Sequence, residues 1–323
     1  MKQSFLKKSL GLLLASALIL PLGLLRAEEA SSDESSTTVE TVEESKESSS
    51  ELESSSEVES ETESASEEAT SVSEETGDYH LTADQLLAQQ TMLAVDWWQN
   101  SAEMRGLFIQ GYALARIRLD EALAKKGDKP LAIALDLDET VLDNGPYQAT
   151  NIREGKGFDP KTWDEWCALK VAKAVPGAKD FLTYADEKGV QIYYISDRGV
   201  NVLNDTIENL KSEGIPVQGE DHVMLKDPED KTGKTARRQK VAEENDLIML
   251  FGDNINDFED FSKKDLGERL SKFEELQAEF GNKFIIFPNP MYGGFESALY
   301  GPEKLDTVGK LEARDKALKP IEK

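Results

Sequence analysis

The chain has 323 residues, and its composition divides it into three parts. Residues 28–77 contain 16 Ser, 17 Glu and one Lys, with no Phe, Tyr or Trp, and carry a net charge of −17. Such a tract cannot bury enough apolar surface to offset its ordering entropy, so we predict that it is disordered. Residues 1–27 carry +4, which leaves −13 of the total of −26 for residues 78–323. That remainder has the size of one globular domain.

The composition also excludes several classes of protein. An acidic balance argues against nucleic acid as a partner, because no basic stripe is available to displace counterions from a duplex. The single cysteine, Cys167, excludes an intrachain disulfide and a zinc site built from several cysteines.

Residues 1–27 have the three parts of a secretory signal: three lysines among the first eight residues, an uncharged apolar stretch over 9–25, and the small residue Ala27. We predict a signal peptide cleaved after Ala27. The alternative is a retained anchor, although 17 uncharged residues fall short of the ~20 that span a bilayer comfortably. Either way, we expect an extracytoplasmic protein, secreted or associated with the cell surface, with residues 28–77 as a solvated spacer.

A long helical pattern begins at Leu81, where Thr82 and Gln85 are placed as a capping box. Trp97 and Trp98 lie within this pattern, and we interpret them as core or dimer contacts, which leaves a homodimer open. Apolar residues then recur at helical spacing, at Met104, Phe108, Tyr112, Ala115 and Leu119.

The remainder of the chain alternates between two patterns. Apolar runs typical of buried strands occupy 130–137, 189–196, 222–225, 246–252 and 283–288. Helical patterns separate most of them, at 177–188, 200–214, 234–244 and 257–280. Strands that alternate with helices predict an α/β domain over 78–323, built on a parallel sheet with helices on both faces.

Acidic and hydroxyl side chains end several of these runs. Asp136, Asp138 and Thr140 follow the first run, Ser196 the second and Asp253 the fourth. Parallel sheets bind ligands beyond the carboxyl ends of their strands, so these groups should converge at one edge. Neighbouring carboxylates repel, and a hard, oxygen-coordinated Mg²⁺ completed by Asp253 would relieve that repulsion.

This combination, together with Lys234 and a Gly-Asp-x-x-x-Asp element that ends at Asp257, resembles the haloacid dehalogenase (HAD) superfamily. The surrounding residues are similar to the class C acid phosphatases, the lipoprotein-e type 5'-nucleotidases. The stretches that carry this similarity are 135–147, 163–166, 174–178, 233–237, 251–258 and 288–293. The resemblance covers roughly 80–300 and implies a HAD-like Rossmannoid sheet. The family's lipoproteins carry a lipidated cysteine after the signal; no cysteine lies near residue 27, so no lipid anchor is expected.

The resemblance implies a role for each of these groups. Asp136 would attack phosphorus and form an aspartyl-phosphate, and Asp138 would act as general acid and then general base. Ser196 would contact a phosphate oxygen and Lys234 would add a fixed positive charge, while Thr140 would help to bind the substrate.

The resemblance also implies a metal shell. Asp136, the backbone carbonyl of Asp138 and Asp253 would hold Mg²⁺. Asp257 would lie outside this shell and orient Lys234 or a metal-bound water.

Substrate selection is expected to come from an insertion at about 143–176, immediately after the nucleophile strand, which we interpret as a small lid. Trp163 could stack on a nucleobase, with Tyr292 as the opposing ring. The alternative is that these rings pack the lid, an interpretation preferred for Tyr147 and Trp166. Cys167 is interpreted as a small buried residue.

We therefore expect a secreted, Mg²⁺-dependent acid phosphatase that hydrolyses small phosphomonoesters, with nucleoside 5'-monophosphates favoured. One alternative is a phosphatase of other small esters, such as sugar or cofactor phosphates. Another is a surface binding protein with an inactive phosphatase domain, against which the intact set of catalytic groups argues.

Overall fold

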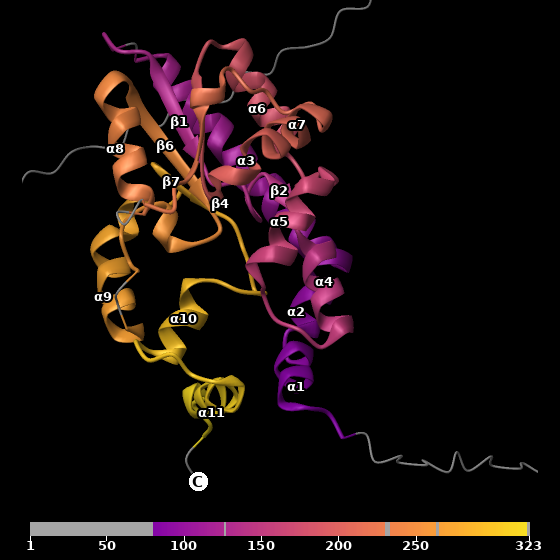
Figure 1. Ribbon diagram of the computed structural model, residues 1–323. Helices are drawn as coiled ribbons and strands as arrows, with labels where there is room; N and C mark the ends of the chain where they lie inside the picture. The colour runs from indigo at the N-terminus through magenta and orange to yellow at the C-terminus, as the bar shows by residue number, and fades with distance from the viewer. Residues whose placement is uncertain (1–79, 126, 230–232, 263–264, 322–323) are drawn as a thin grey trace, which may run out of the picture. The chain divides into compact units, whose positions relative to one another are not determined.

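The computed structural model describes residues 80–321 apart from 126, 230–232 and 263–264. The predicted signal peptide and Ser/Glu tract lie outside the described residues. A five-stranded parallel sheet in the order β5-β4-β1-β6-β7 forms the centre of the domain (Figure 1). Its strands are β1 (Leu131–Leu135), β4 (Gln191–Gly199), β5 (Val223–Lys226), β6 (Asp246–Gly252) and β7 (Phe284–Ile286). Each predicted apolar run overlaps one of these strands, which confirms the predicted α/β fold class.

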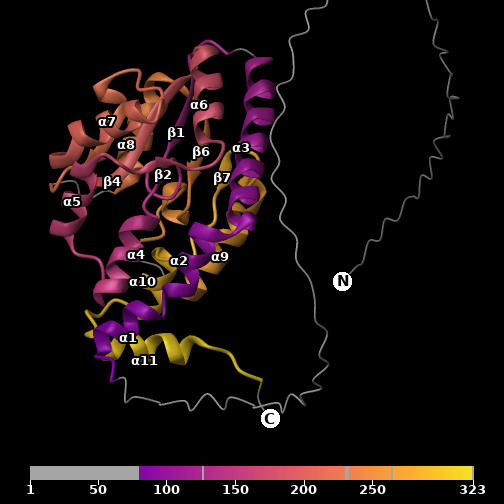
Figure 2. The ribbon, with the colours of Figure 1, turned by 90° about the vertical axis from the view of Figure 1, so that its right-hand side faces the viewer.

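Helices cover both faces of the sheet (Figures 1 and 2). Along β1, Ile133 and Leu135 belong to one buried apolar cluster, whereas Ala132 and Ala134 belong to the other. The first cluster includes side chains of α3 (Ala102–Leu123), α6 (Ala178–Glu187) and α7 (Leu203–Ser212); the second includes Val241 of α8 (Lys234–Glu244). Both faces of β1 are therefore dry, which explains its continuous apolar run.

Two predicted helices are wrong in extent. The pattern from Leu81 forms three helices, α1 (Ala83–Gln89), α2 (Met92–Asn100) and α3, instead of one. Ser101 ends α2 in extended backbone and caps α3 by accepting from the Met104 amide at 3.0 Å. The helix predicted from 257 begins as α9 (Leu266–Leu276), because Asp265 caps it and a 3₁₀ turn, Ile255–Asp257, precedes it.

The side chains of the N-terminal helices lie where the sequence predicts. The capping box at Thr82 and Gln85 is present. Trp98 is 2% exposed, packs edge-to-face on Phe108 and donates to Asp143 at 2.7 Å, so its interpretation as a core residue is confirmed. Trp97 is partly buried against the same core. The predicted apolar positions of α3 are all buried: Met104, Phe108, Tyr112, Ala115 and Leu119.

The predicted insertion carries α4 (Gly145–Glu154) and α5 (Pro160–Leu169). Its ends are joined by a two-stranded antiparallel sheet of β2 (Leu142–Asp143) and β3 (Lys173–Ala174). This pairing holds the insertion directly beside the end of β1, although its function as a lid stays a prediction.

Two helices follow β7, namely α10 (Gly294–Tyr300) and α11 (Thr307–Ala317). They pack on each other, and α11 also packs on α1, far away in the sequence (Figure 2). Among the helices of the described part of the chain, none is long and apolar enough to cross a membrane.

The packing of α3 on the sheet generates a prediction about stability. Phe108 is fully buried, and its ring stacks on Phe287 with centroids 4.7 Å apart. Replacing Phe108 by Ala should lower the free energy of unfolding by about 3–5 kcal/mol, because it leaves a cavity. Chemical denaturation measures this loss. The neighbouring Ile109 is 52% exposed, so Ile109→Ala should change stability by about 0.5 kcal/mol or less; equal losses in the two variants would contradict the packing described.

Candidate active site

The site begins where β1 ends. Asp136 is the first residue after β1, and its amide donates to the carbonyl of Phe251 in β6 at 3.0 Å. The chain then turns back, since the amides of Val141 and Leu142 both donate to the Leu137 carbonyl at 2.8 Å. This tight turn brings both Asp136 and Asp138 to the wall of one cavity.

Three carboxylates converge in this cavity. Asp136, Asp253 after β6 and Asp257 in the 3₁₀ turn each offer an oxygen, and these oxygens lie within 4.8 Å of one another. Lys234, the first residue of α8, donates to Asp136 and, at 2.5 Å, to Asp257. Asn289 donates to Asp253 at 2.8 Å. Residues from β1, β6, α8 and the segment after β7 thus meet at one edge of the sheet.

The electrostatics of this cluster are unbalanced. Burial raises the pKa of Asp136 well above its usual value, opposed by Lys234. Burial, helped by the charge of Asp257, raises the pKa of Asp253 to about 7. Burial would lower the pKa of Lys234, but Asp136 and Asp257 outweigh it and raise that pKa instead. One ammonium therefore does not neutralise the three acids.

A hard divalent cation fits this donor set, since it prefers several carboxylate oxygens and would supply the missing positive charge. Asp136 and Asp253 lie where the sequence predicts metal ligands. The carboxylate of Asp257, which is predicted to lie outside the metal shell, is part of the same cluster and also accepts a hydrogen bond from Lys234.

The carboxylate of Asp138 is held separately. Its Oδ1 accepts from Arg198 Nε at 2.9 Å, Arg198 Nη2 at 2.7 Å and Asn144 Nδ2 at 2.9 Å. The Arg198 side chain has no exposed surface, and Asp138 raises its pKa against the opposing effect of burial. Asn144 in turn accepts from Trp166 of α5 at 2.8 Å. Neither Arg198 nor Asn144 is among the predicted site residues, although Arg198 stands at the polar end of the second predicted strand.

The two hydroxyl residues that are predicted to contact the substrate, Thr140 and Ser196, are both buried. Thr140 is fully buried, its carbonyl accepts from Tyr112 at 2.6 Å, and it does not line the cavity. Its predicted substrate contact stays a prediction, and the structure places Thr140 inside the tight turn that follows Asp136. Ser196 is also fully buried, where its hydroxyl donates to Asp138 Oδ2 at 3.3 Å and accepts from the Arg198 amide. The structure brings Ser196 to Asp138 and not to the cavity surface.

The predicted aromatic pair does line the cavity. Trp163 packs edge-to-face on Tyr147, with centroids 5.1 Å apart, and lies 6.1 Å from the ring of Phe158. Tyr292 donates its hydroxyl to Glu139, and both Trp163 and Tyr292 keep part of their surface exposed.

Cys167 lies in α5, close to these rings in the sequence. It is buried, which raises the pKa of its thiol to about 12 and disfavours the nucleophilic thiolate. This agrees with its interpretation as a small buried residue.

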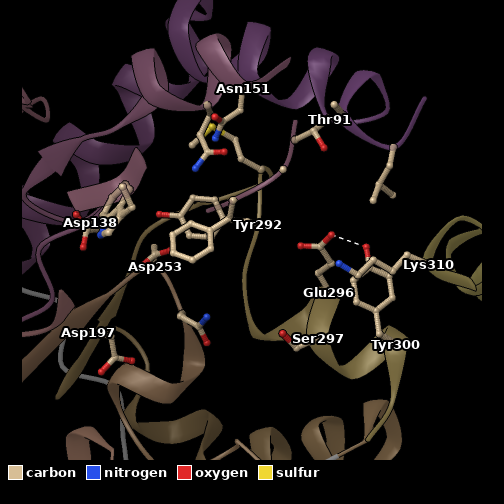
Figure 3. A pocket seen from close by; sticks show the side chains of 18 of the residues that line it. Thr91, Asp138, Asn151, Asp197, Asp253, Tyr292, Glu296, Ser297, Tyr300 and Lys310 are labelled. Atoms are coloured by element: carbon tan, nitrogen blue, oxygen red, sulfur yellow. Dashed lines mark hydrogen bonds between the residues drawn. The ribbon is translucent and has the colours of Figure 1, made fainter. Parts of the chain in front are cut away.

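The cavity has a volume of about 780 Å³. Figure 3 shows Asp138, Asp253 and Tyr292 on one side of it and Glu296, Tyr300 and Lys310 on the other. It therefore extends from the carboxyl edge of the sheet to the C-terminal helices.

A parallel α/β sheet whose edge carries these acids and a lysine has the architecture of a HAD-like phosphatase. The family model described as HAD superfamily, subfamily IIIB (acid phosphatase), matches residues 47–295, and the chain belongs to this family.

Solved structures agree with this assignment. The class C acid phosphatase from Bacillus anthracis is 46% identical, with a TM-score of 0.70, and the similarity covers 73% of this chain and 99% of that one. A second structure of that protein, with tungstate bound, is 45% identical with the same TM-score and covers 74% of this chain and all of that one. The resemblance to class C acid phosphatases is thereby confirmed.

Sequence relatives are more distant. Vegetative storage protein 1 from Arabidopsis thaliana is 27% identical over 53% of this chain and 58% of its own length. The class B acid phosphatase from Marinomonas sp. is 27% identical over 44% of this chain and 61% of its own length. The chain thus spans about three fifths of the length of these relatives.

The raised pKa of Asp253 generates a prediction about pH. A folded-state pKa of about 7, above the ordinary value of 3.8, contributes stability at low pH that is lost as pH rises through about 7. Without metal, the Tm of the wild type should therefore fall relative to that of Asp253→Asn as pH rises from about 5 to about 8. Thermal melts measure this difference. Adding Mg²⁺ should raise the Tm of the wild type more than that of the variant.

A difference in Tm that stays constant across this pH range would contradict the charge imbalance assigned to Asp253.

Proposed function

We propose that the protein is an exported, Mg²⁺-dependent acid phosphatase that hydrolyses small phosphomonoesters, with nucleoside 5'-monophosphates preferred. The observation that carries the proposal is the cluster of Asp136, Asp253 and Asp257 around Lys234, at the sheet edge of a member of the acid phosphatase family.

Asp136 is proposed as the nucleophile. Its carboxylate attacks phosphorus, the bond to the leaving-group oxygen breaks, and an aspartyl-phosphate forms. Lys234 supports this role in two ways. Its ammonium counteracts the effect of burial on Asp136 and favours the ionised carboxylate that attacks. It also supplies positive charge beside the phosphate oxygens, where negative charge spreads in the transition state.

Asp138 is proposed as the general acid and base. It gives a proton to the leaving-group oxygen and later takes one from the water that cleaves the aspartyl-phosphate, which restores both carboxyl groups. The contacts of Arg198 and Asn144 with Oδ1 support this role, because they fix the carboxyl group and leave Oδ2 for proton transfer. The hydroxyl of Ser196 donates to Oδ2 of Asp138 and is proposed to orient it.

The metal ligands proposed are the carboxylates of Asp136, Asp253 and Asp257 and the backbone carbonyl of Asp138. A bound Mg²⁺ would neutralise part of the charge on the phosphate and on these acids. Tungstate, bound in the Bacillus anthracis relative, is an oxyanion like phosphate, and this supports an oxyanion site in the same fold.

Substrate preference is proposed to depend on Trp163 and Tyr292. Both rings line the cavity that contains Asp136. An aromatic ring can stack on any nucleobase, because every base has a flat π face. Export is proposed from the pattern of residues 1–27, and an extracytoplasmic site would let the enzyme act on nucleotides that do not cross membranes.

The direct test is phosphate release from a panel of nucleotides and sugar phosphates, with and without a chelator. We expect activity that a chelator abolishes and that Mg²⁺ restores. Asp136→Asn is the matched control, since the amide has nearly the same shape but is not a nucleophile; its kcat should fall by more than about a thousandfold while the fold is retained. Hydrolysis by this variant within about tenfold of the wild type would rule out the covalent mechanism.

A separate prediction concerns the two rings. Trp163→Ala and Tyr292→Ala should each lower kcat/KM for a nucleoside monophosphate by an amount equivalent to about 1–3 kcal/mol of lost base stacking. The kcat/KM for a phosphate ester without a ring should change little in these variants, because such an ester presents the same phosphate to Asp136 and Lys234. Tyr292→Phe is the control, since it removes the bond to Glu139 but keeps the ring. Equal losses for both kinds of ester would mean that the rings only support the lid.

A further inference from the structure

The cavity extends well beyond the groups that would bind the reacting phosphate. Its volume of about 780 Å³ lies in the upper part of the range of ~300–1,000 Å³ typical of pockets that enclose whole small ligands. Figure 3 shows Glu296, Tyr300 and Lys310, from α10 and α11, opposite Asp138 and Asp253. Residues of α1, among them Asp84, also line the cavity, and Asp84 accepts from Thr307 of α11. We refer to the side formed by α10 and α11 as the distal wall, which consists of Glu296, Ser297, Tyr300, Thr307, Lys310 and Arg314.

Most charged groups of the distal wall already have partners. Arg314 forms an ion pair with Glu296 at 2.5 Å, and it also contacts the Tyr300 hydroxyl at 3.0 Å and Gln90 Oε1 at 2.9 Å. The Tyr300 hydroxyl donates to the same carboxylate oxygen of Glu296 at 2.5 Å. These bonds hold α10, α11 and α1 together, so Arg314 and Glu296 stabilise the packing of these helices.

Lys310 differs from these residues. Its Nζ lies 5.6 Å from the centroid of the Tyr300 ring, and within the described ranges no carboxylate forms an ion pair with it. The side chain is half-buried and lines the cavity. A partly desolvated ammonium without a counter-ion is a favourable place for an anionic group of a ligand. Lys316, on the same helix but outside this cavity, lies 3.7 Å from Glu312 instead.

We propose that the distal wall is an anion subsite, in which Lys310 binds a second phosphate carried by the leaving group of the substrate. Among esters of equal length, one that carries a second phosphate, remote from the phosphate that reacts at Asp136, would then be hydrolysed more efficiently than the monophosphate. This inference rests on the proposed function, because the leaving group must extend from Asp136 towards the distal wall.

The test uses two homologous series that do not depend on a nucleobase. Alkanediol bisphosphates of increasing chain length are compared with alkyl monophosphates of the same length, and the ratio of their kcat/KM values is measured. In the wild type this ratio should pass through a maximum at one chain length, where the second phosphate reaches Lys310. Lys310→Gln should lower that maximum about tenfold, the effect of losing one hydrogen bond to a charged group.

Three further variants sharpen the test. Lys310→Arg should keep most of the maximum, and Lys316→Gln should leave it in place, because Lys316 lies outside the cavity. Lys310→Glu should reverse the preference towards ω-aminoalkyl phosphates, whose remote group is a cation. Thermal melts of all variants establish that they are folded.

The possible results separate the two proposals. Hydrolysis of the monophosphates without any length optimum would overturn the anion subsite, as would an optimum that Lys310→Gln does not change. Failure to hydrolyse any ester of either series would contradict the proposed phosphatase function itself, and the subsite with it.

Discussion

The arrangement of this domain depends on a charge imbalance at one edge of its sheet. Asp136, Asp253 and Asp257 are brought within a few ångströms of one another, and Lys234 donates to two of them, Asp136 and Asp257. Burial of like charges costs free energy that the rest of the fold must offset. The dry, two-sided packing of β1 and its neighbours supplies that stabilisation, and it also keeps the four side chains in fixed positions.

The same edge is connected to the insertion through hydrogen bonds and not through apolar contacts alone. Trp166 of α5 donates to Asn144, and Asn144 donates to Asp138, whose oxygen also binds Arg198. The ring of Trp163 lies 5.7 Å from the Arg198 guanidinium carbon. A displacement of the insertion would therefore alter the surroundings of Asp138, so the roles proposed for the insertion and for Asp138 are physically linked.

The strands and the acids that follow them could be predicted from the sequence, because a buried parallel strand leaves a continuous apolar run and its carboxyl end faces the ligand. The ends of the helices were harder to predict from the sequence, because Ser101 and Asp265 cap helices inside stretches whose helical pattern is otherwise continuous. The burial of Thr140 and Ser196 could not be predicted, because a motif gives residue type and spacing but not exposure.

Arg198 was missed for a related reason. Its place in the site depends on a contact with Asp138 across 60 positions of sequence, which periodicity does not encode. The distal wall was missed as well, because α10 and α11 bury no residue fully and carry a weak apolar pattern.

The contact between α11 and α1 has a consequence for the order in which the domain forms and opens. Thr307 donates to Asp84 across 223 positions, and Arg314 reaches the carbonyl of Leu87 across 227. These bonds are polar, and one is exposed and the other partly buried, whereas the sheet edge is anchored in the apolar core. Local opening should therefore begin at α11, at a free energy well below that of global unfolding. During such openings the acidic cluster at the sheet edge would stay intact, whereas the distal wall would be displaced. The size of the ligand that the cavity can enclose would then vary without any change in the groups around Asp136.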